Sequence, residues 1–145
     1  MPIIAAVDRT ETQGSIVEEA RELATAFDEE LHVVHVISQK ELREIEQRTV
    51  EETGQSVPLE EIREFAQKAA TEAATDHAET YTPVGLVGEA SDELVKYADT
   101  EDARFVVIGG RRRSPIGKAI FGSVAQEVLL TASCPVVMVV RENDS

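Results

Sequence analysis

Tryptophan is absent from the sequence, and Phe and Tyr together make up only 4% of its 145 residues. Apolar residues still account for 42% of the chain, so it is not intrinsically disordered and its core must be built from aliphatic side chains. This length predicts one domain over residues 1–145. A domain of this size buries roughly 68–70% of its unfolded surface, enough for a core without disulfides or metals.

Cysteine and long hydrophobic runs are also scarce. The single cysteine, Cys134, cannot form an internal disulfide. No apolar run approaches the roughly 20 residues that span a bilayer, and no signal peptide is recognisable at the start. These absences predict a cytoplasmic protein without membrane insertion.

Basic residues are outnumbered, since 28 acids against 14 bases give a net charge of −14. Nucleic-acid binding is therefore disfavoured, because phosphate contacts need Lys and Arg clustered over a broad face. An acidic composition with few Lys is typical of a salt-rich cytoplasm and predicts a halophilic archaeal source. An ordinary acidic protein is the alternative.

One segment departs from this acidic average. Residues 103–126 contain no acid and carry a net charge of +5, which leaves −19 for the other 121 residues. Such a basic segment favours a local anion site, and the alternative is a solvated loop that offsets neighbouring acids. Its basic residues are Arg104, Arg111, Arg112, Arg113 and Lys118.

Short apolar runs alternate with helical periodicity along the chain. Strands are predicted at 2–7, 31–37, 81–87, 105–108 and 135–140, and helices at 15–27, 59–74, 91–98 and 123–132. Residues 38–58 are expected to be irregular or partly helical. Capping boxes are predicted at Ser15–Glu18 and Ser123–Gln126, and a Ser cap at Ser91.

This alternation predicts a doubly wound, five-stranded parallel sheet in a three-layer, Rossmann-like α/β domain with right-handed crossovers. The strand order taken is 3-2-1-4-5, which periodicity alone does not determine. Ligands of such sheets bind beyond the C-terminal strand ends, where the strand order reverses, here between strands 1 and 4.

Asp8 closes strand 1, Gly109-Gly110 close strand 4, and the following basic loop leads to Gly122-Ser123 at a helix start. A carboxylate can bind ribose hydroxyls or help hold a metal on phosphates. Glycines let phosphate oxygens approach the backbone, and a helix start offers free N–H groups. From their charge alone, the further phosphate candidates are Arg111, Arg112, Arg113 and Lys118.

The sequence does not match the common catalytic and metal-binding motifs. Gly117-Lys118 resembles the end of a Walker A loop, but Arg112 stands at its first Gly and Ala119 replaces its Ser or Thr. His32 and His35 alternate to opposite strand faces and do not form a metal pair. We therefore expect no catalytic residue and no tightly bound metal.

Three segments carry a resemblance to a known family: IIAAVD at the start, HVVHVI in strand 2 and GGRRRSPIGKAIFGSVAQEVLLTASCPVVMVV at 109–140. With them, the chain resembles the universal stress protein family over essentially its whole length. The family's nucleotide-binding branch carries an Asp after strand 1 and the motif G-x2-G-x9-G-[ST] after strand 4. Gly109 matches its first position and Gly122-Ser123 its last two, while Arg112 stands at the second glycine.

The resemblance implies a stress-response regulatory domain of the adenine nucleotide alpha hydrolase-like type, which binds ATP or AMP with Mg²⁺. Asp8 would contact ribose or the metal-phosphate group, Val36 would bind adenine through its backbone, and Gly109 would lie beside the ribose. The phosphates would be held by Gly122, Ser123 and Val124. Family members dimerise through the last strand, here 136–140, so we expect a homodimer; any regulatory protein partner is unidentified.

The substitution at the second motif glycine leaves alternatives open. In one, Arg112 closes the pocket and the protein is a dimeric stress-response scaffold that binds no nucleotide. A lesser alternative is a slow ATPase or nucleotidyl transferase on a similar sheet. Where a nucleotide is bound, Asp8 would meet a metal only through the Mg²⁺ on that nucleotide.

Overall fold

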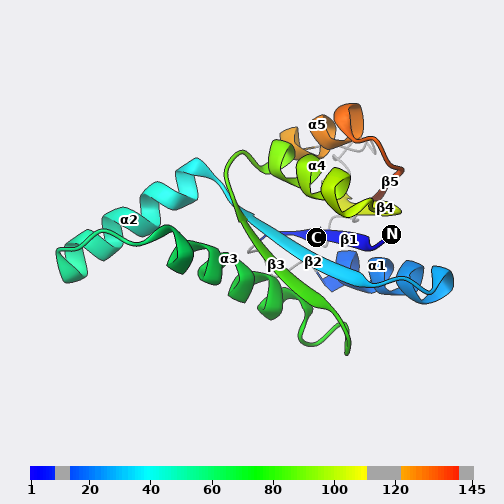
Figure 1. Ribbon diagram of the computed structural model, residues 1–145, viewed down its shortest axis with the longest axis horizontal. Coiled ribbons are helices and arrows are strands. Elements are labelled where there is room, and N and C mark those ends of the chain that lie inside the picture. The colour runs from blue at the N-terminus through cyan, green and yellow to red at the C-terminus, as the bar shows by residue number, and fades with distance from the viewer. Residues whose placement is uncertain (9–13, 111–121, 141–145) are drawn as a thin grey trace, which may run out of the picture.

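The computed structural model describes residues 1–8, 14–110 and 122–140 (Figure 1). Five strands and five helices lie in these ranges. The strands are β1 (Ile3–Val7), β2 (Leu31–Ile37), β3 (Thr82–Val87), β4 (Phe105–Gly110) and β5 (Val136–Val140). The helices are α1 (Gly14–Phe27), α2 (Gln39–Thr53), α3 (Leu59–Ala74), α4 (Ala90–Glu101) and α5 (Ser123–Thr131).

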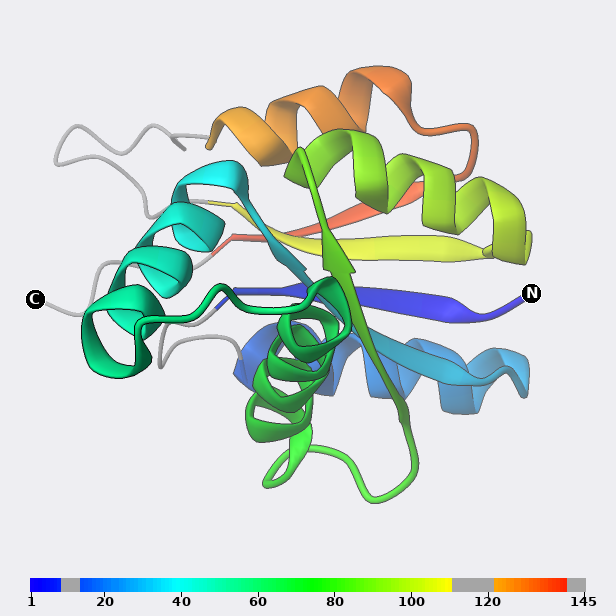
Figure 2. The same ribbon diagram turned by 60° about the vertical axis from the view of Figure 1, so that its left-hand side comes forward.

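All five strands pair in parallel, in the order β3-β2-β1-β4-β5. The predicted doubly wound sheet and its strand order are confirmed. Helices α1 and α3 cover one face of the sheet, and α4 and α5 cover the other (Figures 1 and 2). The result is the predicted three-layer α/β domain.

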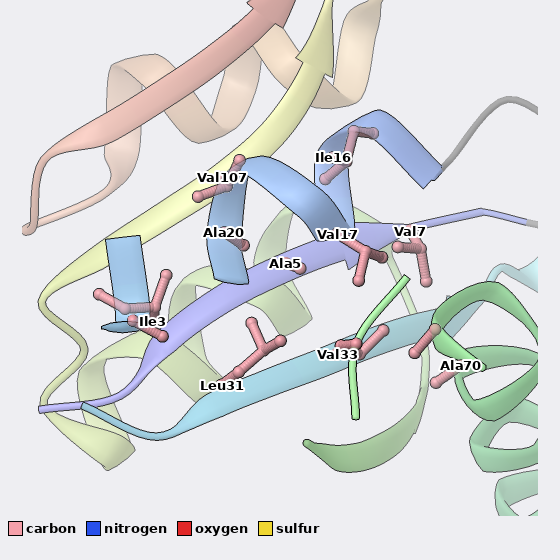
Figure 3. Packing of buried hydrophobic residues seen from close by; sticks show 13 residues of the cluster. Ile3, Ala5, Val7, Ile16, Val17, Ala20, Leu31, Val33, Ala70 and Val107 are labelled. Carbon is pink, nitrogen blue, oxygen red and sulfur yellow. The ribbon is translucent and has the colours of Figure 1, made fainter. Parts of the chain in front are cut away.

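Aliphatic residues from alternate strand positions form a core on each face. In β1, Ile3, Ala5 and Val7 pack toward α1 and α3 (Figure 3), whereas Ile4 packs with the α4–α5 layer. Both faces of the central strands are covered, so their sequences read as continuous apolar runs. The prediction of an aliphatic core is therefore confirmed.

The segment between β2 and α3 is more regular than expected, since most of it is helix α2. The Ser38 hydroxyl accepts a hydrogen bond from Glu41 N at 3.2 Å, which caps the N-terminus. At the other end, Gly54 adopts a left-handed conformation with φ of 72° and donates its N–H to the Val50 carbonyl. No α2 residue is buried, so these caps largely determine where the helix begins and ends.

The three predicted serine caps are wrong, although α5 does begin at Ser123 as predicted. Helix α1 already begins at Gly14, and the buried Ser15 Oγ has no hydrogen-bond partner among the described residues. Helix α4 is capped by the carboxylate of Glu89, which accepts from the Ser91 hydroxyl at 2.6 Å and from Asp92 N at 2.9 Å. In α5 the N-cap is Gly122, one residue before the expected cap. More than one residue near each helix start can act as a cap, so the local pattern leaves the cap ambiguous by one or two positions.

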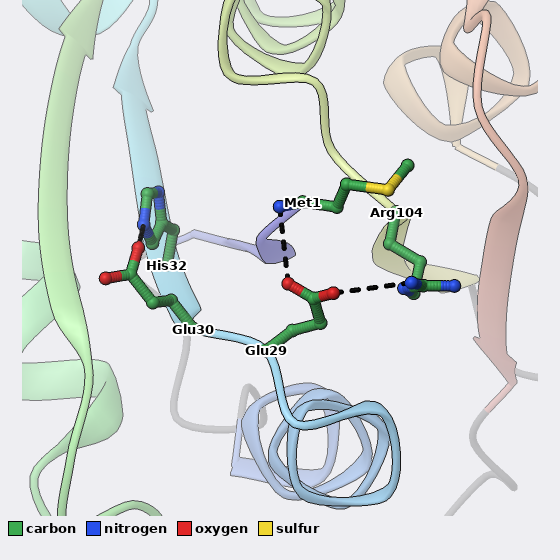
Figure 4. Close-up of polar contacts among 5 residues, drawn as sticks. All are labelled: Met1, Glu29, Glu30, His32 and Arg104. Carbon is green, nitrogen blue, oxygen red and sulfur yellow. Dashed lines mark hydrogen bonds and ion pairs between the residues drawn. The ribbon is translucent and has the colours of Figure 1, made fainter.

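Ion pairs hold the edge of the sheet where the strands begin (Figure 4). The Glu29 carboxylate lies 3.2 Å from the Met1 amine and 3.3 Å from Arg104 Nη2. These two cations, the amine first, hold the pKa of Glu29 below its usual 4.5. Nearby, His32 Nε2 lies 3.3 Å from Glu30 Oε2.

Candidate functional site

Strand pairing changes at the C-terminal edge of the sheet. The β1–β2 ladder runs to the end of β1, where Val7 pairs with His35. The β1–β4 ladder stops earlier, at Ala5 and Val107, although β4 continues to Gly110 alongside β5. The two halves of the sheet therefore part between β1 and β4, at the point where the strand order reverses and open α/β sheets bind ligands.

Asp8 and Val36 reach this edge from adjacent strands. Asp8 follows β1 directly and is exposed. Val36 is the next-to-last residue of β2, is 9% exposed and packs with the α4–α5 layer. Since Val7 pairs with His35, Asp8 and Val36 occupy the next positions on the neighbouring strands. The structure thus brings these two predicted residues to the same edge.

Glycines end β4 on the other side of the parting. A Cβ on Gly109 would lie 2.8 Å from Ile16 Cδ1, so the glycine allows the first turn of α1 to approach β4 closely. A Cβ on Gly110 would lie 3.0 Å from Met138 Sδ. Both glycines belong to β4 and pair with β5, so this strand extends two residues beyond the predicted 105–108. Gly109 has a packing role that the motif alone does not reveal.

The start of α5 lies toward the same side of the molecule as the end of β4 (Figure 2). Gly122 is the N-cap and its carbonyl accepts the Gln126 N–H at 3.0 Å. The N–H groups of the first turn have no carbonyl partner within the helix, so they can donate hydrogen bonds to an anion. Ser123 and Val124 are exposed there, and the first turn contains no acid. In contrast, α2, α3 and α4 all carry acids in their first turns.

The other predicted phosphate residues, Arg111, Arg112, Arg113 and Lys118, lie outside the described residues. Their roles, including closure of the pocket by Arg112, stay predictions. The described part of the site therefore consists of the carboxylate after β1, the end of β2, the glycines of β4 and the start of α5.

Sequence reasoning missed a buried residue beside this edge, His35. Its ring is 2% exposed, and Nδ1 lies 3.0 Å from the Val7 carbonyl oxygen. A carbonyl only accepts, so Nδ1 donates to Val7, while Nε2 lies 3.4 Å from Glu41 Oε2 of α2. The imidazole therefore connects the end of β1 to the first turn of α2. A histidine within an apolar strand could have indicated this role, because a buried polar ring needs hydrogen-bond partners.

Within the described ranges, no group of three or more His, Cys, Asp or Glu side chains could hold a metal ion. His32 contacts Tyr97 on α4, with Nδ1 2.6 Å from the hydroxyl, while His35 contacts α2, so the two rings do lie on opposite faces. No helix of the same ranges has both the length and the apolar composition needed to cross a bilayer.

Comparison with known proteins agrees with this architecture. A model of the Universal stress protein family matches residues 1–140. The chain belongs to the universal stress protein family. A universal stress protein of Mycolicibacterium smegmatis is 47% identical over 57 residues, which span 39% of this chain and 42% of the relative.

Solved universal stress proteins share the fold over nearly the whole chain. A structure from Archaeoglobus fulgidus is 32% identical, covers 95% of this chain and 97% of its own, and gives a TM-score of 0.67. Another structure from the same organism, in complex with dAMP, is 25% identical in sequence. The match covers 95% of this chain and 96% of the other, with a TM-score of 0.62. The resemblance to universal stress proteins is therefore confirmed, while the halophilic source stays a prediction.

Proposed function

We propose that this universal stress protein binds an adenine nucleotide, ATP or AMP with Mg²⁺, as a regulatory ligand. The observation that carries the proposal is the early end of the β1–β4 ladder, with Asp8 on one side and the β4 glycines on the other. The acid-free start of α5 lies toward the same side of the molecule. A related structure described as a complex with dAMP supports this class of ligand.

Each described group has a chemical task in this proposal. Asp8 accepts hydrogen bonds from the ribose hydroxyls or helps hold Mg²⁺ on the phosphates. The Val36 backbone binds adenine, and Gly109 leaves room beside the ribose. The N–H groups at Gly122, Ser123 and Val124 bind phosphate oxygens. The basic residues supplying further charge are Arg111, Arg112, Arg113 and Lys118.

The proposed activity is binding without turnover. We assign no catalytic residue, and steady phosphate release that is lost in Asp8→Ala would contradict this assignment. The lone Cys134 supports a reducing cytoplasm as the compartment. The net charge of −14 supports a salt-rich one.

Calorimetry with ATP and MgCl₂, and separately with AMP, tests the binding proposal. The wild type should release binding heat, and Asp8→Ala should bind about tenfold more weakly because a charged hydrogen-bond partner is lost, about 1.4 kcal/mol. Asp76→Ala is the matched control, since it removes one exposed carboxylate from the segment after α3. Absence of heat from the wild type at millimolar nucleotide would refute nucleotide binding.

Arg112→Gly restores the second motif glycine and separates two roles of this arginine. If the guanidinium binds phosphate, as proposed, the variant binds ATP more weakly than the wild type. If Arg112 instead closes the site in a scaffold protein, the variant binds ATP more tightly or gains binding. The second result, with no binding by the wild type, would replace the nucleotide proposal by the scaffold.

We also propose a homodimer formed through β5. Among the described strands it lies at the edge of the sheet and pairs with β4 alone, so its outer backbone groups can pair with a second β5 across a two-fold axis. Apolar side chains remain accessible nearby, with Val140 39% and Leu130 of α5 73% exposed. Light scattering should give about twice the 15.9 kDa chain mass. A monomer at tens of micromolar would refute the dimer.

A further inference from the structure

Helix α2 is packed more loosely than the other helices. It has no buried residue, whereas each of the other four helices buries at least two. Its apolar side chains Leu42 and Ile45 are only half-buried, against a small cluster of Ile37, Ile62 and Ala66. In Figure 1, α2 projects away from the sheet at one end of the molecule. The inner side of α2 is thus only partly covered by its own chain.

A groove of about 270 Å³ lies between α2 and α3. Its apolar lining comes from both helices and the segment between them: Ile45, Val57, Ile62 and Phe65. The α2 wall is formed by positions 41, 44, 45, 48, 49 and 52, which recur at the spacing of one helix face. This volume lies just below the roughly 300–1,000 Å³ of small-molecule pockets, so it suits an inserted side chain better than a cofactor.

The charged residues around this lining are mostly acidic. Four carboxylates and one guanidinium line the groove, a net charge of −3: Glu41, Glu44, Glu52 and Glu61 against Arg48. An anionic partner would be repelled, and a cationic one attracted, because interfaces match charge of opposite sign. A second copy placed face to face would bring the same acidic wall against this one, so the charge also disfavours self-association here.

We propose that the α2–α3 groove binds a basic, amphipathic helical segment of a partner protein. A large apolar side chain of that segment enters the space lined by Ile45, Val57 and Ile62, and its Lys or Arg residues face Glu44 and Glu52 on the wall. This is the helix-in-groove mode, in which apolar anchors lie on one face of the bound helix. The proposal is independent of nucleotide binding at the C-terminal edge of the sheet.

The test is an NMR titration of the ¹⁵N-labelled protein with a capped 14-residue peptide of Lys and Leu, with Leu at helical spacing. Amide shifts should concentrate in 41–52 and 57–65. The double variant Glu44→Lys/Glu52→Lys should lower the affinity for the peptide about tenfold or more, since two attractive contacts become repulsive. The matched control Glu46→Lys/Glu51→Lys makes the same charge change on exposed α2 positions outside the groove, and should change the affinity less than twofold.

A second peptide separates the apolar anchor from simple charge attraction. Replacing every Leu by Ser keeps the charge and should weaken binding about tenfold or more, because the anchor is lost. Circular dichroism checks that both double variants keep the helical content of the wild type. Shifts spread over the acidic surface, equal weakening by the two double variants, or equal binding of the Ser peptide would each overturn the proposal.

Discussion

Helices α2 and α3 are adjacent in sequence and nearly equal in length, with 15 and 16 residues, yet they contribute differently to the fold. Helix α3 buries five residues, four of them alanines, whereas α2 buries none. The small side chains allow α3 to lie directly on β3. Amphipathic spacing alone therefore does not show how deeply a helix is buried, because the size of its inward residues and the surface opposite them also matter.

The largest expected effect is on the contact between α3 and the sheet. A Cβ at Gly85 of β3 would lie 2.3 Å from the Arg63 carbonyl oxygen and 2.4 Å from Gln67 N. These are backbone atoms, so Gly85→Ala must displace α3, and we expect a loss of about 3 kcal/mol in the free energy of unfolding. Urea unfolding of the variant and the wild type measures this change in the free energy of unfolding. Gly110→Ala is the control, because its Cβ meets the flexible Met138 side chain and should cost less.

Isoleucine truncation compares the two helices directly. Ile62 of α3 is 2% exposed, and Ile62→Ala should destabilise the protein by about 2 kcal/mol through lost burial and a cavity. Ile45 of α2 is half-buried, so Ile45→Ala should cost only about 1 kcal/mol. Equal losses in urea unfolding would show that α2 is held as firmly as α3.

The smallest expected effect is on the α2 cap. Ser38→Ala removes the acceptor for Glu41 N and should lower the stability of α2 by about 1 kcal/mol. Hydrogen exchange should show this loss in α2 amides while α3 amides keep their protection, because loosely packed elements open locally. Ser56→Ala, at an exposed position between the helices, is the control. A uniform loss of protection would mean that the two helices unfold together.

The sheet was predictable because each strand is an apolar run bounded by polar residues, as in LHVVHVI. The strand order came from the expected doubly wound topology, since no local pattern encodes which strands pair. Helix α2 was missed as a complete helix because charged residues outnumber its apolar ones. The caps failed where a neighbour took the role expected of a serine, as Gly122 does for Ser123.

The candidate site was predictable where it depends on topology. Asp8 and Val36 follow from the ends of adjacent strands, and the structure places them at one edge. The contact of Gly109 with Ile16 was not predictable, because it joins residues that are distant in sequence. The same holds for His35, whose partners on β1 and α2 are set by the packing of three elements.

The caps of α2 have an evolutionary consequence. Because Ser38 and Gly54 define both helix ends and no residue between them is buried, the exposed positions of 39–53 can change without altering the core, whereas Leu42 and Ile45 still pack against it. Substitutions, or a change of length by whole turns, can therefore accumulate there while the sheet is conserved.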